Sequence, residues 1–198
     1  MTGGPAFFAN LSRSFGFWKT KYADIALTND GKTATVFSNS GGSAICDIFH
    51  STGKHYFELL MEGPSGAYIP GAAFAPSVGI INQGNLSRVP GVETTSWGIE
   101  SSGRRIHNSV FEYWGPGGYG PDDVLMFAVD SDAKKVWYGK NGAWPADPVS
   151  GLGQMAIMTG TEFAPAFGSA YKDAKATIIT NNSEFHYAKP TGYLAWYV

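Results

Sequence analysis

The sequence predicts an all-β protein made of two stacked antiparallel sheets. The chain is rich in turn-forming residues, poor in charge, and has its apolar residues in many short runs. Of 198 residues, 26 are glycine and 11 are proline, while charged residues make up only 15%. Glycine and proline are the poorest helix formers and among the commonest turn residues, so long helices are not expected. Several of the short runs alternate apolar with polar residues, which is typical of sheets that pack face to face.

Composition and charge also exclude several classes of function. A hydrophobic fraction of 43% is sufficient for a core, and 198 residues is a usual size for one sandwich domain. The formal net charge of −2 provides no basic surface for a phosphate backbone, so nucleic-acid binding is not expected. No run of 18 apolar residues is present, and the N-terminus has no basic segment followed by an apolar one. We therefore expect no membrane insertion and no secretory signal.

The N-terminal third is expected to hold an arm and a hairpin. Residues 1–23 are interpreted as an irregular arm packed on the body, because Gly16 and the polar residues 12–14 interrupt any periodicity. Residues 24–198 are expected to form the sandwich, since no linker divides them. Within it, residues 24–37 resemble a hairpin with its turn at 29–32, and residues 44–49 resemble a short strand.

Residues 54–62 are the next strong strand. One face is expected in the core and consists of His55, Phe57, Leu59 and Met61. The other face is expected to be half-solvated and consists of Tyr56, Glu58, Leu60 and Glu62. Further short strands are expected at 78–81, 97–100, 154–158, 163–168 and 175–180, and residues 104–108 are a candidate to pair back onto 97–100.

The segment 121–142 carries the strongest structural signal. Val124–Val129 is an apolar run of strand formers, and Asp130–Ala133 is suited to reverse the chain. Lys135–Lys140 then alternates, with Val136 and Tyr138 on one face and Trp137 on the other. Asn141-Gly142 suits the positive φ angles of a type I′ turn. The segment is therefore predicted to form two antiparallel strands followed by a second tight turn.

Several motifs, taken in order, resemble those of SPRY (B30.2-like) domains. The matching segments are Gly53–Glu58, Ser77–Ile80, Ser96–Ile99, Asp123–Gly142, Phe163–Phe167 and Pro190–Tyr193. Thr177–Asn182 departs from the family pattern, because no glycine follows the strand. The resemblance spans about residues 35–196. It implies a lectin-like β-sandwich that recognises partners through loops at one rim and does no chemistry. The sequences of segments Trp137–Trp144 and Tyr193–Trp196 are most similar to those of SPRY-like modules of phage virion or bacterial proteins.

The residues themselves provide no catalytic, metal or cofactor site. Glycosidases place two carboxyl groups about 5–9.5 Å apart, whereas Glu58 and Glu62 would lie about 13 Å apart along a strand. Asp130 and Asp132 are interpreted as turn-stabilising rather than calcium-binding. The four histidines are scattered without metal-binding spacing, and the single cysteine, Cys46, is expected to be buried. We expect no catalytic residues, no metal and no cofactor.

Binding through loops is the remaining hypothesis. The candidate loops are 63–77, 82–95, 104–121 and 139–151, and their candidate ligand-binding residues are Tyr68, Arg88, Tyr113, Trp114, Tyr119 and Trp144. Tyrosine, tryptophan and arginine dominate binding hot spots. The alternative for each residue is that it anchors its loop by packing. Trp97 and Trp137 are expected in the core.

The sequence therefore predicts a non-catalytic recognition module for a protein or a glycan. The expected setting is a phage virion, as a tail or capsid decoration that contacts the host surface or other virion proteins. The protein would then be located in the virion, after synthesis in the host cytoplasm, and otherwise in the cytoplasm. A homo-oligomer is compatible with either. The alternatives are a lectin-like carbohydrate-active enzyme and a purely architectural virion assembly protein.

Overall fold

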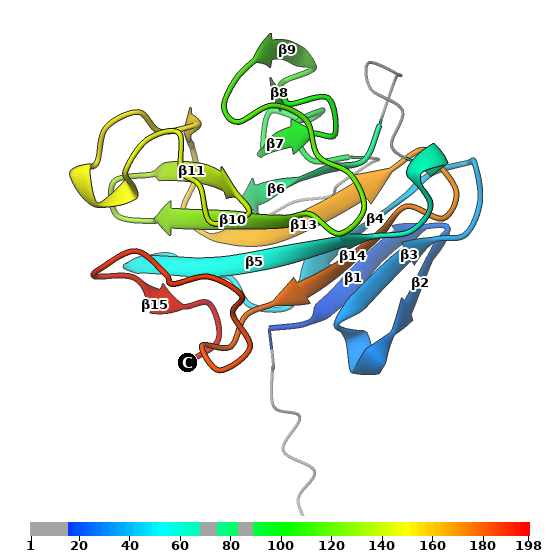
Figure 1. The fold of residues 1–198 in the computed structure, drawn as a ribbon, viewed down its shortest axis with the longest axis horizontal. Coiled ribbons are helices and arrows are strands. Elements are labelled where there is room, and N and C mark those ends of the chain that lie inside the picture. The colour runs from blue at the N-terminus through cyan, green and yellow to red at the C-terminus, as the bar shows by residue number, and fades with distance from the viewer. Residues whose placement is uncertain (1–15, 68–74, 83–88) are drawn as a thin grey trace, which may run out of the picture.

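The computed structural model describes residues 16–67, 75–82 and 89–198, which form two sheets stacked face to face (Figure 1). The strand order is β1-β4-β13-β6-β7-β8-β9 in the first sheet and β12-β11-β10-β5-β14-β3-β2 in the second, with β15 also paired to β5. Every strand pairing within these ranges is antiparallel except that of β15. The predicted antiparallel β-sandwich is confirmed. No helix among the described residues is long and apolar enough to cross a membrane.

The first sheet consists of β1 (Trp18–Ala23), β4 (Gly42–Cys46), β13 (Phe163–Ser169), β6 (Ser77–Asn82), β7 (Ser96–Glu100), β8 (Arg104–His107) and β9 (Val110–Tyr113). The second consists of β12 (Ala156–Ile157), β11 (Lys135–Lys140), β10 (Val124–Asp130), β5 (Lys54–Glu62), β14 (Lys175–Ile179), β3 (Thr33–Val36) and β2 (Ile25–Thr28), with β15 at Leu194–Ala195. The described part of the chain also contains three short 3₁₀ turns, η1 (Asn29–Gly31), η2 (Ser65–Ala67) and η3 (Pro148–Ser150).

The predicted turns of segment 121–142 are confirmed. The Asp130 carboxylate accepts a hydrogen bond of 2.8 Å from the N–H of Ala133, which closes the turn between β10 and β11. Asn141 and Gly142 have φ angles of 49° and 82°, and Lys140 and Ala143 exchange two backbone hydrogen bonds of 2.9 Å. This is the geometry of a two-residue type I′ turn. Local turn chemistry therefore sets the register of this part of the sheet.

The main core lies between the sheets and includes Trp97 and Phe163 of the first sheet and the neighbouring Phe57 and Phe127 of the second. Phe57 and Phe127 stack with ring centroids 4.9 Å apart, and Trp196 meets Phe57 edge-on at 5.1 Å. Trp97 and Trp137 are both buried, as predicted. Trp97 belongs to this core, whereas Trp137 lies in a second cluster on the outer face of the second sheet. The lone Cys46 is buried among the core residues, and burial raises the pKa of its thiol.

The expectation of a half-solvated outer face on β5 is wrong for Tyr56 and Glu58, which are buried. The C-terminal segment folds over this face and brings Tyr193 and Phe185 against Tyr56 (Figure 1). Leu60 is partly buried, as expected of that face. Alternation along a strand shows which side chains share a face, but it does not show which distant segment covers them.

Residues 18–23 also differ from the expected irregular arm. They form β1, which pairs with β4 at the edge of the first sheet, with a register irregularity between Trp18 and Thr20. After Asp24 the chain enters β2 at the edge of the second sheet. One flank of the sandwich is therefore closed by the chain passing from sheet to sheet. Residues 1–15 of the predicted arm lie outside the described residues.

Candidate binding site

The other flank is bordered by β9 of the first sheet and β12 of the second (Figure 1). β8 and β9 form a hairpin whose turn residues, Asn108 and Ser109, have φ angles of 51° and 60°. These positive values match a type I′ turn. The Ser109 N–H donates to the carbonyl of Gly91 at 3.1 Å, and its hydroxyl donates to the carbonyl of Val92 at 3.2 Å. The hairpin tip is thus tied to the segment that precedes β7.

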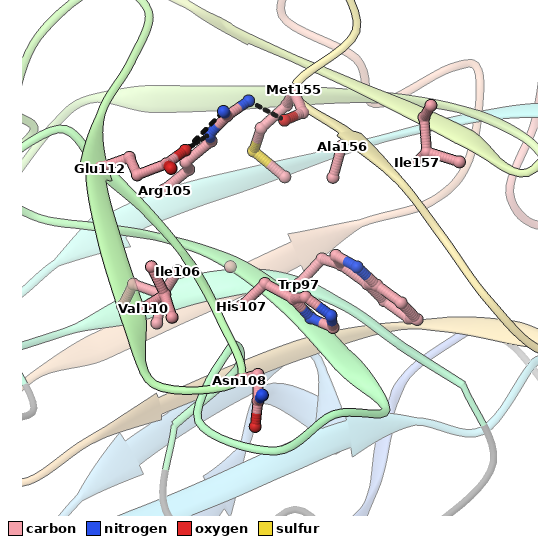
Figure 2. Close-up of a pocket in the computed structure, with 11 residues that line it drawn as sticks. Trp97, Arg105, Ile106, His107, Asn108, Val110, Glu112, Met155, Ala156 and Ile157 are labelled. Atoms are coloured by element: carbon pink, nitrogen blue, oxygen red, sulfur yellow. Dashed lines mark hydrogen bonds and ion pairs between the residues drawn. The ribbon is translucent and has the colours of Figure 1, made fainter.

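A cavity of about 370 Å³ lies between this hairpin and β12 (Figure 2). The rings of Trp97 and His107 stack at its wall, with centroids 4.9 Å apart and planes 9° from parallel. The apolar lining residues are Trp97, Ile106, Val110, Met155, Ala156 and Ile157, and the polar ones are Arg105, His107, Asn108 and Glu112. An apolar lining with a few polar groups at its border is typical of a ligand site.

Arg105 joins the two sheets across this cavity. Its Nε donates to a Glu112 carboxylate oxygen at 2.8 Å, and its Nη1 donates to the backbone carbonyl of Met155 at 2.9 Å (Figure 2). The first contact lies within the β8–β9 hairpin, and the second reaches the residue before β12. Exposed ion pairs of this kind contribute little to stability. Arg105 instead fixes the distance between the β8–β9 hairpin and the segment that leads into β12.

The structure separates the residues predicted to bind. Tyr113, at the end of β9, has 86% of its surface exposed. Trp114 turns toward Tyr138 in the main core, with ring centroids 6.2 Å apart. Trp144 packs near Tyr56 on the opposite face of the second sheet, at 6.3 Å.

Of the other three predicted residues, one is a buried loop anchor and two lie outside the described residues. Tyr119 is buried, and its hydroxyl donates to the backbone carbonyl of Pro76 at 2.7 Å, which is the geometry of a loop anchor. Tyr68 and Arg88 lie outside the described residues. Of the four predicted residues that are described, Tyr113 is the one on the hairpin beside the cavity.

Sequence reasoning missed β9 and the cavity it borders. Residues 110–113 were placed inside the expected loop 104–121, although Asn108-Ser109 is a turn signal and Val-Phe-Glu-Tyr is rich in strand formers. Ile157 lay in an expected strand, and only the structure shows that 64% of its surface is exposed. A cavity between segments about 50 residues apart leaves no local pattern in the sequence.

The buried carboxylates of the described chain are tied to neighbouring groups of the protein. Glu58 accepts hydrogen bonds from Tyr56 and from the backbone of His186 and Tyr187. Glu100 accepts from the side chains of Ser102 and Arg104. Among residues 16–67, 75–82 and 89–198, no group of three or more His, Cys, Asp or Glu side chains is placed to hold a metal ion.

No family model and no curated protein sequence matches the chain. Solved structures do match. The SPRY domain of human HERC1 has a TM-score of 0.64 at 16% identity, covering 80% of this chain and 93% of that one. The chain has the SPRY fold. The TRIM65 PSpry domain gives 0.61 at 13% identity, with coverages of 85% and 93%. A human SPRY domain gives 0.59 at 16%, with coverages of 81% and 97%.

These comparisons confirm the fold that the sequence resemblance implied. The motif segments 53–58, 77–80, 96–99 and 163–167 form β5, β6, β7 and β13 at the centre of the SPRY fold. At such low identity the likeness concerns the arrangement of strands. The β8–β9 hairpin and the flank cavity are therefore described from this chain's own residues.

Proposed function

We propose that this protein is a non-catalytic recognition module that binds a protein or a glycan. The observation that carries the proposal is the flank cavity and its exposed apolar border. Val110 and Ile157 stand on either side of the cavity, with 58% and 64% of their surfaces exposed (Figure 2). Tyr113 belongs to the same β8–β9 hairpin as Val110 and is also exposed. Exposed apolar side chains gathered beside a cavity commonly mark a binding site.

Hydrogen bonds hold both ends of the hairpin beside the cavity, which supports a preformed site. The hairpin tip is hydrogen-bonded to Gly91 and Val92, and Arg105 holds the hairpin to the backbone of Met155. A preformed site loses little conformational freedom when it binds, which favours affinity. Tyr68 and Arg88 remain predicted binding residues of the rim loops, while the packing of Trp114, Tyr119 and Trp144 favours the loop-anchoring alternative.

The biological setting is part of the same proposal. The sequences of segments Trp137–Trp144 and Tyr193–Trp196 support the proposal that the protein is a phage virion component. Its role there would be host attachment or contact with other virion proteins. Mass spectrometry of purified particles from the source phage tests this setting. Recovery of the chain with the particles supports it, and recovery only from the cytoplasm of the producing cells contradicts it.

A glycan array and a displayed random-peptide library, probed with the purified protein, test the binding function. We expect selective binding to one of the two, weakened at least tenfold by Tyr113→Ala and by Ile157→Lys. Leu194→Lys is the matched control, because Leu194 is similarly exposed and pairs with β5, far from the cavity lining. Release of shorter sugars from bound glycans would support the enzyme alternative. Binding to neither probe would contradict the proposal.

A further inference from the structure

We propose that the ligand of the flank site is an extended segment of a partner protein, which pairs with β9 as an additional strand of the first sheet. This inference rests on the proposed function and names the class of its ligand. β9 is the last strand in the order of that sheet, and within the described residues it pairs with β8 alone. A sheet edge presents backbone donors and acceptors that an incoming strand can satisfy.

The hairpin geometry shows which backbone groups point outward. In a two-residue hairpin the closing pair, here His107 and Val110, is hydrogen-bonded, and bonded and non-bonded pairs then alternate. The Trp114 N–H donates to the carbonyl of Gly103 at 3.2 Å, which agrees with this phase. Phe111 and Tyr113 therefore belong to non-bonded pairs. Their N–H and C=O groups point away from β8, toward the position of an added strand.

The face of β9 that borders the cavity determines the ligand's side-chain pattern. Val110 and Glu112 line the cavity, whereas Phe111 and Tyr113 lie on the other face of the strand. An antiparallel guest would hydrogen-bond to Phe111 and Tyr113. Its residues opposite Val110 and Glu112 would point into the space between the sheets. The guest residue opposite Val110 would extend the exposed apolar surface of that side chain, so an apolar residue is favoured there.

Charge favours a different chain over a second copy of this one. If the β9 strands of two copies paired antiparallel, their outward backbone groups would all be bonded when Phe111 of one copy lies opposite Tyr113 of the other. In that register the two Glu112 side chains lie directly opposite each other. Arg105 binds Glu112 through Oε2 and offsets part of its charge, but two facing carboxylates cannot donate hydrogen bonds to each other, and like charges directly opposite destabilise a strand pair. A guest with a hydrogen-bond donor, such as Lys or Arg, opposite Glu112 avoids this repulsion. Read in the guest's direction, the expected pattern is a donor followed two positions later by an apolar residue.

Selection from a displayed library of random 12-residue peptides tests the mode of binding. We expect the enriched peptides to share this donor–x–apolar spacing. In synthetic versions, methylating the backbone nitrogens that face Phe111 and Tyr113 should weaken binding about tenfold each, as loss of a backbone hydrogen bond predicts. Methylating the nitrogens between them should have little effect, because in a strand these N–H groups point the other way.

Two pairs of protein variants make the complementary test. Phe111→Pro removes an outward N–H at a sheet edge, where proline is tolerated, and Phe111→Ala removes only the side chain. We expect the proline variant to bind the selected peptides about tenfold more weakly than the alanine variant. Val110→Lys should also weaken binding, and Leu194→Lys, at a similarly exposed position, should not. Thermal unfolding of each variant confirms that it is folded, and the methylated peptides test the idea independently of any variant.

Several outcomes would overturn strand addition. They are a lack of peptide binders, equal sensitivity to methylation at every position, and equal binding by Phe111→Pro and Phe111→Ala. A dimer in sedimentation that Phe111→Pro abolishes would identify a second copy as the occupant and overturn the assignment. Glycan binding that depends on Tyr113, without peptide binding, would overturn strand addition and leave the recognition function intact. Absence of both kinds of binding would contradict both proposals.

Discussion

The Glu58 carboxylate joins β5 to the C-terminal segment. One oxygen accepts hydrogen bonds from the Tyr56 hydroxyl at 2.7 Å and the Tyr187 N–H at 2.9 Å, and the other accepts from the His186 N–H at 2.8 Å. Burial raises the pKa of Tyr56, and the nearby Glu58 charge raises it further, so the hydroxyl remains a donor. Hydrogen bonds to a charged acceptor are stronger than neutral ones. The Glu58 carboxylate therefore accepts the hydrogen bonds that these three donors would otherwise make to water.

We expect Glu58→Gln to lower the free energy of unfolding by about 2–4 kcal/mol. An amide group turns an NH₂ toward at least one of the backbone N–H donors and leaves a buried donor unsatisfied. Urea unfolding monitored by tryptophan fluorescence measures the change. The matched control is Glu112→Gln at an exposed ion pair, where we expect a loss within about 1 kcal/mol. Equal losses in the two variants would contradict the structural role of Glu58.

Two histidines beside the C-terminal tryptophan make stability depend on pH. The rings of His50 and His55 stack with centroids 3.5 Å apart, and His50 Nε2 is hydrogen-bonded to the carbonyl of Trp196 at 2.8 Å. Burial, followed by the charge of His50, lowers the pKa of His55 to about 4, although Asp132 opposes the shift. Burial also lowers the pKa of His50. Both rings are therefore favoured in their neutral form.

We expect stability to fall as the pH drops from about 6.5 to about 4. The unfolded chain takes up protons near the ordinary histidine pKa of about 6.5, while the folded chain resists until lower pH. The pair's contribution is therefore complete above about pH 6.5 and is lost toward pH 4, by up to about 3 kcal/mol for His55. Urea midpoints between pH 8 and pH 4 measure this. His55→Phe should flatten the decline, and parallel curves would show that the pair does not cause it.

At the scale of elements, glycines in β6 and β7 allow another segment to lie directly on the first sheet. Gly79 and Gly98 are opposite each other in the ladder. A Cβ on Gly98 would lie 2.3 Å from the carbonyl oxygen of Pro90, which accepts a hydrogen bond of 2.9 Å from the Ser77 hydroxyl. The same segment continues to Gly91, whose carbonyl holds the tip of the β8–β9 hairpin. The absence of a side chain in β7 thus helps position the candidate site.

We expect Gly98→Ala to destabilise the protein by about 2 kcal/mol or more, because the added methyl group meets backbone that must shift. The tip of the hairpin should loosen too, so the Ser109 amide hydrogen should exchange faster with solvent. Gly120→Ala is the matched control, since its Cβ would meet no atom within 4 Å. We expect the control to change stability by about 1 kcal/mol or less. Unchanged Ser109 exchange in Gly98→Ala would contradict this link between segment and hairpin.

Viewed as a whole, the sandwich is completed by its C-terminal segment (Figure 1). β15 pairs with the beginning of β5, and the Trp196 N–H donates to the Tyr56 carbonyl at 2.8 Å. The Trp196 indole is fully buried, and its Nε1–H donates to the carbonyl of Ile48 at 3.1 Å. The last residues therefore contribute to the main core and also cover the outer face of the second sheet.

We expect Trp196→Ala to cost about 3–5 kcal/mol, the range for truncating a large buried aromatic side chain. Leu194→Ala, two residues earlier and exposed, should cost no more than about 1 kcal/mol. Denaturant midpoints compare the two variants. A similar small loss in both would mean that the C-terminal segment adds little to the stability of the sandwich.

Strands and turns were largely predictable because their causes are local. Residues 54–62 were expected as a strand and form β5 with the same bounds, and Asn141-Gly142 forms the expected tight turn. Turn chemistry and alternating polarity involve neighbours in the chain and are therefore visible in its order of residues. β9 was missed because its four residues are too few to stand out from the glycine-rich segment that follows them.

The candidate site could not be predicted to the same extent, because it depends on contacts between distant segments. Residue type alone identified Tyr113 as a candidate, yet Trp114 and Trp144, chosen on the same grounds, pack on opposite faces of the second sheet. Composition and local pattern established an antiparallel sandwich without long helices. Tertiary packing established the burial of Glu58, the closure of one flank and the cavity at the other, because burial depends on which remote segment arrives at a surface.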